Sequence, residues 1–540
     1  MKRFAYEVMI YTVRIIATTG PPSAGVAISG HQLLDIPGKM RNAGIFHIML
    51  FTGEVGVTRS ATLVPWLTAV AFSVAIAAFA VVEPIPQAGS VRPVPAFAKD
   101  SPAIRTANFV GATGCAAASC HGGDVGHKGG EYATWAGHDP LKDDECVQAR
   151  DPHSRAYRVL FNAKSERIAR NLTASLGKEI PAHENSLCLK CHSQPDAFQQ
   201  NVTNVDASQI IDRNVGCESC HGPAEHYLST HYLPEHLAKS PDDKARDIGL
   251  FPTKDLAFRT QLCASCHIGD GSREVNHDLI AAGHPRLNFE YTRFHHAGNY
   301  QKHWKEPSPN FTEHAWSIGQ VATLRSAISA LQKRAELAIN NKAPWPEFAE
   351  YSCYACHQNL GPDRKGWSAV NETNRTPGSL AWGTWTLPML DGVDDWTKMH
   401  MPQELKELQQ EMERPQPSPA KVAKLCKSID RQLGIALYQS LRPEVKPVEQ
   451  WNTLDVADDL IKNALNKQRT KLNSLDWDGA TQLVVALQSL YRNDFARPKL
   501  EPTIAALDKE LKDPAKCNPE TVLKLIQELH DQVNHKERKR

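Results

Sequence analysis

The sequence predicts a mainly α-helical protein with a loop-rich first region and a helical second region. Apolar residues recur mostly at helical spacing, and the alternation typical of strands is rare. Histidine, glycine and proline are frequent up to about residue 361, whereas glycine becomes rare and long amphipathic patterns begin near residue 402. These changes divide the chain into five segments, namely 1–58, 59–98, 99–361, 362–401 and 402–540.

Two helices are expected within segment 99–361. One covers residues 154–172, and its apolar positions are Tyr157, Leu160, Ile168 and Leu172. The other covers residues 318–339, where apolar residues recur at Val321, Leu324, Ile328, Leu331 and Ala335. Segment 362–401 contains Gly-Trp, Pro-Gly and Trp-Gly pairs and is expected to be a linking loop, whose tryptophans either pack this loop or line a cofactor.

Segment 402–540 is expected to form a C-terminal domain of roughly four to six helices, judged from its apolar periodicity. Asn518-Pro519 marks a helix start, because asparagine caps helices and proline suits the first turn. Cys426 lies on an apolar stripe and is expected to be a small core residue. The apolar faces comprise Val422, Leu425, Ile429, Leu433 and Leu437, then Ala480, Leu483, Val484, Leu487 and Leu490, then Val522, Leu525, Ile526 and Leu529.

A repeated cysteine–histidine motif dominates segment 99–361. Four copies have the form Cys-x-x-Cys-His, and a longer first copy has four residues between its cysteines. Ten of the 13 cysteines belong to these motifs. The motif residues are Cys115, Cys120 and His121; Cys188, Cys191 and His192; Cys217, Cys220 and His221; Cys263, Cys266 and His267; and Cys353, Cys356 and His357.

This spacing indicates covalent attachment of c-type haem. Two thiols add to the haem vinyl groups, and the adjacent histidine becomes the proximal ligand of the iron. Zinc could use the cysteine pairs, but neither zinc nor disulfides explain a histidine after every second cysteine. With 23 histidines in 540 residues, five such coincidences are improbable. We therefore expect five haem c groups and a haem-free C-terminal domain.

Each haem iron needs a second axial ligand if it is six-coordinate. Every methionine after Met49 lies beyond the last motif, so bis-histidine ligation is expected. The preferred second ligands stand in local motifs and are His153, His226, His277 and His284. His138, His183 and His295 are weaker candidates, and His295, His296 and His303 are also spare groups for acid–base chemistry.

Attachment of haem to two thiols takes place outside the bacterial cytoplasmic membrane, so an export signal is expected. Residues 61–82 carry no charge, and their length suits either a cleaved signal peptide or a retained membrane anchor. Residues 1–58 would be an N-terminal extension, or Met49 would be the true start. The 61 basic and 60 acidic residues include no long basic block, so nucleic-acid binding is not expected.

At three places the sequence resembles the multihaem cytochrome c superfamily of the cytochrome c-552/554 type. These are Gly216–Pro223 with His226, Asp151-Pro152-His153 before a tyrosine-containing helix, and the stretch from Asn276 to Leu287. The resemblance covers about residues 105–360. It implies a periplasmic electron carrier with closely packed haems, which works beside other oxidoreductases. The long first motif, the five motifs and the added C-terminal region depart from that pattern.

Two functions remain open from the sequence. The first is electron transfer to redox partner proteins, with no catalytic residue of the chain's own. The alternative is an oxidoreductase that acts on a small nitrogen or sulfur compound at one haem with an open coordination position. The C-terminal helices could in addition dock a partner or the membrane.

Overall fold

The computed structural model is almost wholly helical in the residues that it describes. The one β feature among them is an isolated antiparallel bridge between Tyr351 and Trp382, so the mainly helical fold class is confirmed. The described residues are 107–125, 128–137, 151–194, 207–297, 300–304, 306, 311–357, 378–383, 385–390, 393, 402–440, 458–461, 477–491, 500–513 and 516–537.

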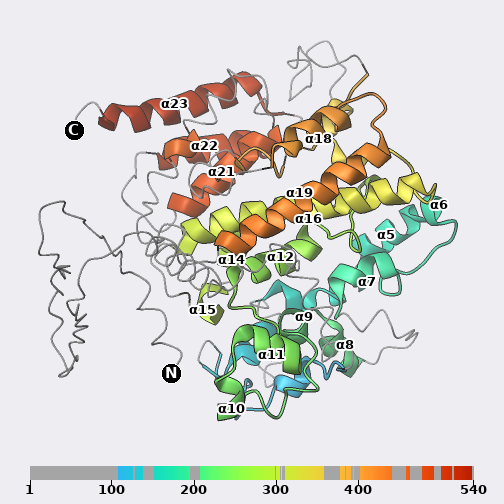
Figure 1. Cartoon of the computed structure of the whole chain (residues 1–540), viewed down its shortest axis with the longest axis vertical. Helices are drawn as coiled ribbons and strands as arrows, with labels where there is room; N and C mark the ends of the chain where they lie inside the picture. Colours follow the sequence, from blue (N-terminus) through green and yellow to red (C-terminus); the bar gives the residue numbers. More distant parts are fainter. Residues whose placement is uncertain are drawn as a thin grey trace, which may run out of the picture. The chain divides into compact units, whose positions relative to one another are not determined.

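The described helices differ in length between the two halves of the chain (Figure 1). The first half holds short elements: η3 (Ala112–Cys115), α4 (Glu131–Ala136), η4 (Pro152–Arg155), η5 (Arg158–Phe161), α5 (Ala163–Asn171), α6 (Thr173–Leu176), α7 (Ser186–His192), α8 (Ala207–Arg213), α9 (Cys217–His221), α10 (Pro234–Leu237), α11 (Pro241–Ile248), α12 (Leu256–His267), α13 (His277–Ala281), α14 (Tyr291–Ala297) and α15 (Tyr300–Trp304). The later elements are α16 (Phe311–Ile339), η6 (Phe348–Glu350), η7 (Cys353–Ala355), α18 (Glu404–Met412), α19 (Pro419–Ser440), α21 (Trp477–Tyr491), α22 (Glu501–Glu510) and α23 (Pro519–Glu537).

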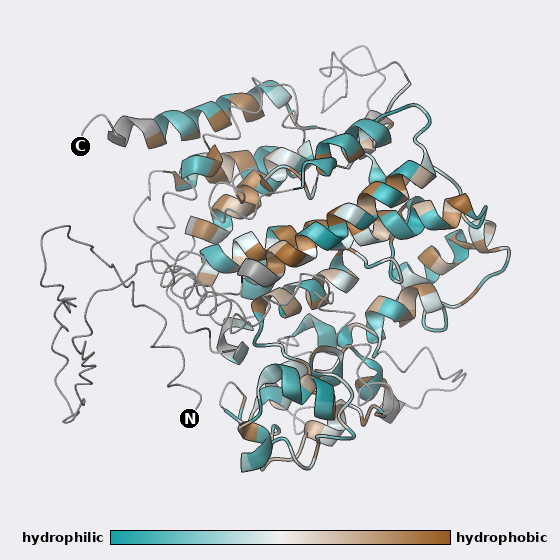
Figure 2. Ribbon diagram, in the orientation of Figure 1, coloured by the Kyte–Doolittle hydropathy of each residue, from teal (hydrophilic) through white to brown (hydrophobic). Residues whose placement is uncertain are grey.

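The long helices α16 and α19 lie side by side and form the centre of the largest hydrophobic core (Figure 1). Hydrophobic residues recur along both helices in Figure 2. Helix α16 is buried on several sides, because α12, α14 and α21 also pack against it. The core continues from Leu256 to Val533 and therefore joins the motif-bearing region to the C-terminal helices.

A glycine and an arginine set the close packing around α16. A Cβ atom at Gly319 would lie 2.7 Å from the Cβ of Tyr291, so glycine lets α14 approach closely. Arg325 lies against Gly434 of α19, and its Nε donates to Asp430 at 2.9 Å. The guanidinium also donates to Gln261 of α12, so one buried arginine links three helices.

The C-terminal helices agree with their sequence patterns. Helices α19, α21 and α23 occur where apolar residues repeat at helical spacing. Asn518 caps α23, since its Oδ1 accepts from the backbone N–H of Glu520 at 2.9 Å. Cys426 is fully buried in the core, as expected from its place on the apolar stripe.

The expected helix over residues 154–172 is wrong as a single element. The chain forms η4 and η5 there, and α5 begins only after Asn162. The side chain of Asn162 accepts from the N–H of Ser165 at 2.9 Å, which is a helix cap that interrupts the continuous pattern. Tyr157 and Leu160 are nevertheless buried, as the apolar spacing suggested.

The tryptophans of the expected linking loop that are described pack inside the protein. Trp382 and Trp385 are both buried. The indole N–H of Trp385 donates to the carbonyl of Phe289 at 2.9 Å, and Gln482 donates to the carbonyl of Trp385 at 2.8 Å. This segment therefore connects the motif-bearing region to α21.

Several expectations fall on residues that the structure does not describe. The N-terminal extension, the apolar stretch 61–82, His138 and Cys146 lie outside the described residues. Among the helices in the described part of the chain, none is long and apolar enough to cross a membrane.

Candidate haem-binding sites

Each cysteine–histidine motif is presented by a short helix or a helical turn. An α-helix has about 3.6 residues per turn, so two cysteines three residues apart lie on the same side of it. The adjacent histidine then follows within the same turn. Helices α7, α9 and α12 carry the second, third and fourth motifs and end at the motif histidine. The turns η3 and η7 hold only the first cysteine of the first and fifth motifs, and the rest of each motif follows the turn.

The motif thiols are available for covalent attachment. All cysteines in the described part of the chain are free, including the ten of the five motifs. The motif cysteines are half-buried or exposed, whereas Cys426 and Cys517 are buried in the core. The motif cysteines are thus more accessible than the two core cysteines, as expected if only the motif cysteines react.

Every motif histidine faces a second histidine. The distances between ring centroids lie between 5.9 and 6.3 Å. The pairs are His121 with His231 at 6.1 Å, His192 with His284 at 6.3 Å, His221 with His303 at 5.9 Å, His267 with His153 at 6.0 Å, and His357 with His277 at 6.3 Å.

This spacing fits a metal ion between two imidazoles. A metal–nitrogen bond is about 2 Å long and the nitrogen lies about 1 Å from its ring centroid, so the centroids should be about 6 Å apart. Rings in direct van der Waals stacking would be closer. The paired histidines, together with the adjacent thiols, therefore fit the donor set of a six-coordinate haem c.

Hydrogen bonds at Nδ1 orient several of these rings. The Nδ1 atoms of His192, His231 and His284 lie 2.8 to 3.0 Å from backbone carbonyl oxygens. Those of His121 and His153 lie 3.0 Å from the carboxylates of Glu131 and Asp151. A ring that donates through Nδ1 leaves Nε2 with its lone pair, which is the form that binds a metal.

Burial keeps two of the motif rings neutral. It lowers the pKa of His221 and of His267 to about 4. Neighbouring histidines act in the same direction, namely His303 on His221 and His153 on His267. A neutral imidazole is the ligating form, so these environments suit coordination.

Exposed aromatic rings border the histidine pairs. Phe294 is 39% exposed and meets His267 edge-on at 5.1 Å between centroids. Phe348 is 55% exposed and meets His277 at 5.9 Å. Large apolar side chains are usually buried, so these rings provide surfaces that an apolar porphyrin would cover.

One segment of the chain matches a known family. Residues 143–222 match the family model described as cytochrome c554 and c-prime. No curated protein and no solved structure matches the chain. This cytochrome c554 domain contains the second and third motifs together with His153, and it implies covalently bound haem c, a role in electron transfer and an exported protein.

The structure brings some, but not all, of the expected second ligands beside a motif histidine. His153, His277 and His284 each face a motif histidine. His226, in contrast, is exposed and is not one of the five facing histidines. No local pattern in the sequence marks His231 or His303 as a second ligand, because their pairing depends on tertiary contacts.

The third motif of the cytochrome c554 domain is clamped to the first motif. Glu218, between the two cysteines of the third motif, is almost fully buried. Its carboxylate accepts from the backbone N–H groups of Val110, Gly111 and Ala224 at 2.7 to 3.0 Å. An interaction with Cys217 lowers the pKa of the Cys115 thiol, so the two attachment sites are adjacent.

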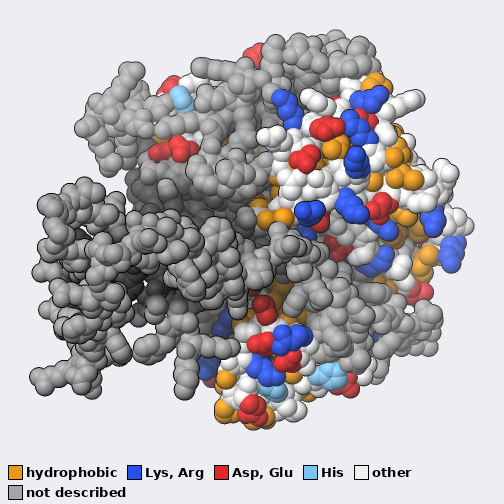
Figure 3. Space-filling view, viewed as in Figure 1, with side chains coloured by type: hydrophobic (Ala, Val, Ile, Leu, Met, Phe, Trp, Pro, Cys, Tyr) orange, Lys and Arg blue, Asp and Glu red, His pale blue; other side chains and the backbone are white. Residues whose placement is uncertain are grey.

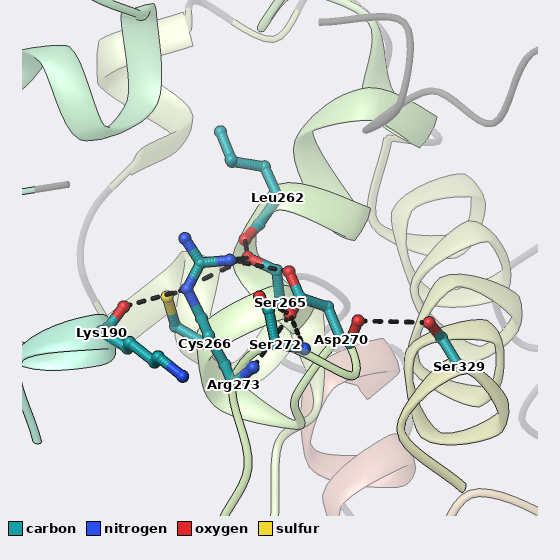
Figure 4. Close-up of polar contacts among 8 residues, drawn as sticks. All are labelled: Lys190, Leu262, Ser265, Cys266, Asp270, Ser272, Arg273 and Ser329. Carbon is teal, nitrogen blue, oxygen red and sulfur yellow. Dashed lines mark hydrogen bonds and ion pairs between the residues drawn. The ribbon is translucent and has the colours of Figure 1, made fainter. Parts of the chain in front are cut away.

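The second motif of the same domain is clamped to the fourth motif by Arg273 (Figure 4). The Nε of Arg273 donates to the carbonyl of Lys190 at 2.9 Å, and its Nη1 pairs with Asp270 at 2.7 Å. Here an interaction with Cys191 lowers the pKa of the Cys266 thiol, so these two side chains also lie near each other. The attachment sites thus form two adjacent pairs, first with third and second with fourth.

Proposed function

We propose that this protein is an exported multihaem c-type cytochrome that transfers electrons through five covalently bound haems. The observation that carries the proposal is that each of the five motif histidines faces a second histidine at a spacing suited to one metal ion. The family match at residues 143–222 supports haem c as the cofactor.

The chain's own residues would hold each haem in three ways. The two cysteines of a motif form the thioether links, and the two facing histidines bind the iron. Hydrogen bonds at Nδ1 fix the orientation of the imidazoles, as at His192 and His284. When bound, a haem c supplies a one-electron couple between ferric and ferrous iron.

The clamps between motifs support electron transfer from haem to haem. Glu218 holds the third motif against the first, and Arg273 holds the fourth against the second. Cysteine side chains from different motifs interact within each pair, so the porphyrin edges attached to them would also be close. Short edge-to-edge distances are the structural requirement for rapid electron transfer.

Ligation by two histidines favours a carrier over the alternative of an oxidoreductase. An enzyme that acts on a small nitrogen or sulfur compound would need an iron with an open coordination position. A facing histidine at each motif would occupy that position. The electrons would instead pass to redox partner proteins, in the periplasm or beside the membrane if residues 61–82 are retained as an anchor.

Haem counting and spin state test this function together. The protein, produced in a host that attaches haem c, should show by intact mass five haems linked to one chain. Electron paramagnetic resonance of the oxidised protein should then show low-spin ferric haem only. A smaller haem number would contradict the proposed set. A high-spin haem that binds nitrite or hydroxylamine would favour the oxidoreductase.

A further inference from the structure

The ligand histidine His153 has an unusual set of neighbours. Its Nδ1 lies 3.0 Å from Oδ1 of Asp151 and 2.7 Å from the hydroxyl oxygen of Tyr300. The hydroxyl of Tyr300 donates to the same Oδ1 at 2.8 Å. The backbone N–H of His153 donates to that oxygen as well, at 3.0 Å. Three donors therefore converge on one carboxylate oxygen.

The surroundings of this carboxylate strengthen its effect on His153. The Asp151 side chain is only 14% exposed, so water screens its charge weakly. Because Nε2 would bind the metal, Nδ1 carries the proton, and its N–H is shared between Oδ1 of Asp151 and the hydroxyl oxygen of Tyr300. A carboxylate that accepts from a ligand imidazole increases the electron donation of that ligand to the metal.

Other histidines of the haem pairs have weaker partners. The Nδ1 atoms of His192 and His284 both face neutral backbone carbonyls. His121 also faces a carboxylate, but the side chain of Glu131 is 34% exposed and more open to screening by water. The centre formed by His153 and His267 is therefore the one with the most buried carboxylate among these contacts.

We propose that Asp151 tunes the haem held between His153 and His267 to a lower reduction potential than the neighbouring haem held between His192 and His284. This inference rests on the proposed function. Stronger donation from His153 stabilises ferric iron, whereas the two carbonyl contacts of the neighbouring centre carry no full charge. Within this adjacent pair, an electron would thus come to rest on the haem of the second motif.

Tyr300 moderates this effect. Its hydroxyl donates to Asp151, which withdraws part of the negative charge that the carboxylate presents to His153. Loss of the hydroxyl would leave Asp151 a stronger acceptor for His153. The two residues should therefore act in opposite directions on the same haem, although only one of them carries a charge.

Two substitutions test the proposal on the fully haem-loaded protein. Asp151→Asn keeps the shape of the side chain and removes its charge, and it should raise the reduction potential of the His153 haem. The charge of Asp151 also acts on His303, so a smaller rise at that centre is expected. Tyr300→Phe changes no charge and should lower the potential of the His153 haem alone.

The measurements are potentiometric titration followed by visible absorption, and electron paramagnetic resonance of the same samples. The low-spin signal of the His153 haem should move in both variants, because a hydrogen bond to the ligand alters the field at the iron and a distant charge does not. Glu131→Gln is the matched control and should shift a different haem. Equal shifts in the same direction for Asp151→Asn and Tyr300→Phe, or unchanged low-spin signals, would overturn the proposal.

The haem number and spin state of the unmodified protein separate this inference from the proposed function. If five low-spin haems are present and the two variants leave the potentials unchanged, Asp151 has no tuning role and the carrier function stands. If the unmodified protein lacks the haem at the fourth motif, the proposed function itself fails. Intact mass of each variant identifies any loss of haem that would mimic a shift.

Discussion

Arg273, which follows the fourth haem-attachment motif, donates through its Nε to the carbonyl of Lys190 in the second motif at 2.9 Å. Its Nη1 pairs with Asp270, close behind the fourth motif, at 2.7 Å. These contacts join two sites that are distant in sequence into one structural unit.

Substitution of Arg273 by methionine should destabilise the protein. It removes the guanidinium that pairs with Asp270, which is 17% exposed and keeps its contacts with Ser272, and it frees the carbonyl of Lys190. We expect the free energy of unfolding to fall by about 2–3 kcal/mol. Denaturant titration measures this, with Arg246→Met as control. Arg246 is an exposed partner of Asp243, so its loss should have little effect. Equal effects of the two changes would contradict the clamp.

Substitution of His231 by alanine should convert one haem from low spin to high spin. His231 faces His121, so its loss opens one coordination position while the thioether links remain. Optical and electron paramagnetic resonance spectra measure the high-spin fraction, which should equal one haem per chain. His226→Ala is the control, since His226 is exposed in the same segment. If only the His226→Ala control gave a high-spin haem, His226 and not His231 would be the second ligand.

The angles between facing imidazoles predict two classes of low-spin signal. The rings are nearly perpendicular in the pairs His192–His284 and His153–His267, at 83° and 81°. They are nearly parallel in His121–His231 and His277–His357, at 16° and 20°. Perpendicular ligand planes keep two iron d orbitals nearly degenerate and give strongly anisotropic signals. Electron paramagnetic resonance of the oxidised protein should therefore resolve both classes, and a single class would contradict the ligand geometry.

Substitution of Gly319 by alanine should destabilise the helix pair α14 and α16. Alanine normally favours a helix over glycine by about 1 kcal/mol. Here its Cβ would meet the Cβ of Tyr291 at 2.7 Å, so the helices must separate. We expect a net loss of about 1–2 kcal/mol in the free energy of unfolding. A gain in stability, measured by denaturant titration, would show that the helices separate at no cost.

The parts of the fold that follow from local pattern could be predicted from the sequence. Helices α19 and α23 have apolar residues at helical spacing, and Asn518 marks the start of α23. The helix break at Asn162 could not be predicted from the apolar pattern, because the apolar residues on both sides of it continue the helical period. The break depends on one side-chain hydrogen bond, which periodicity does not report.

The attachment motifs could be predicted for the same reason, because the two cysteines and the histidine of each motif lie close together in the sequence. Of the facing histidines, His153, His277 and His284 stand in local motifs and could be predicted, whereas His231 and His303 could not, because their pairs depend on how distant segments pack. His303 meets His221 only through the fold, and no spacing in the sequence marks the pair. Figure 3 shows basic and acidic side chains intermixed on one face, and this arrangement likewise follows only from the structure.

The shared core of α16 and α19 changes how the C-terminal helices should be regarded. Leu324 and Leu331 of α16 are fully buried in a core that also contains Leu433 of α19 and Leu487 of α21. A chain cut before residue 402 would leave much of this surface of α16 in water, directly before the fifth attachment motif. The C-terminal helices thus supply part of the core on which the motif-bearing part of the chain folds.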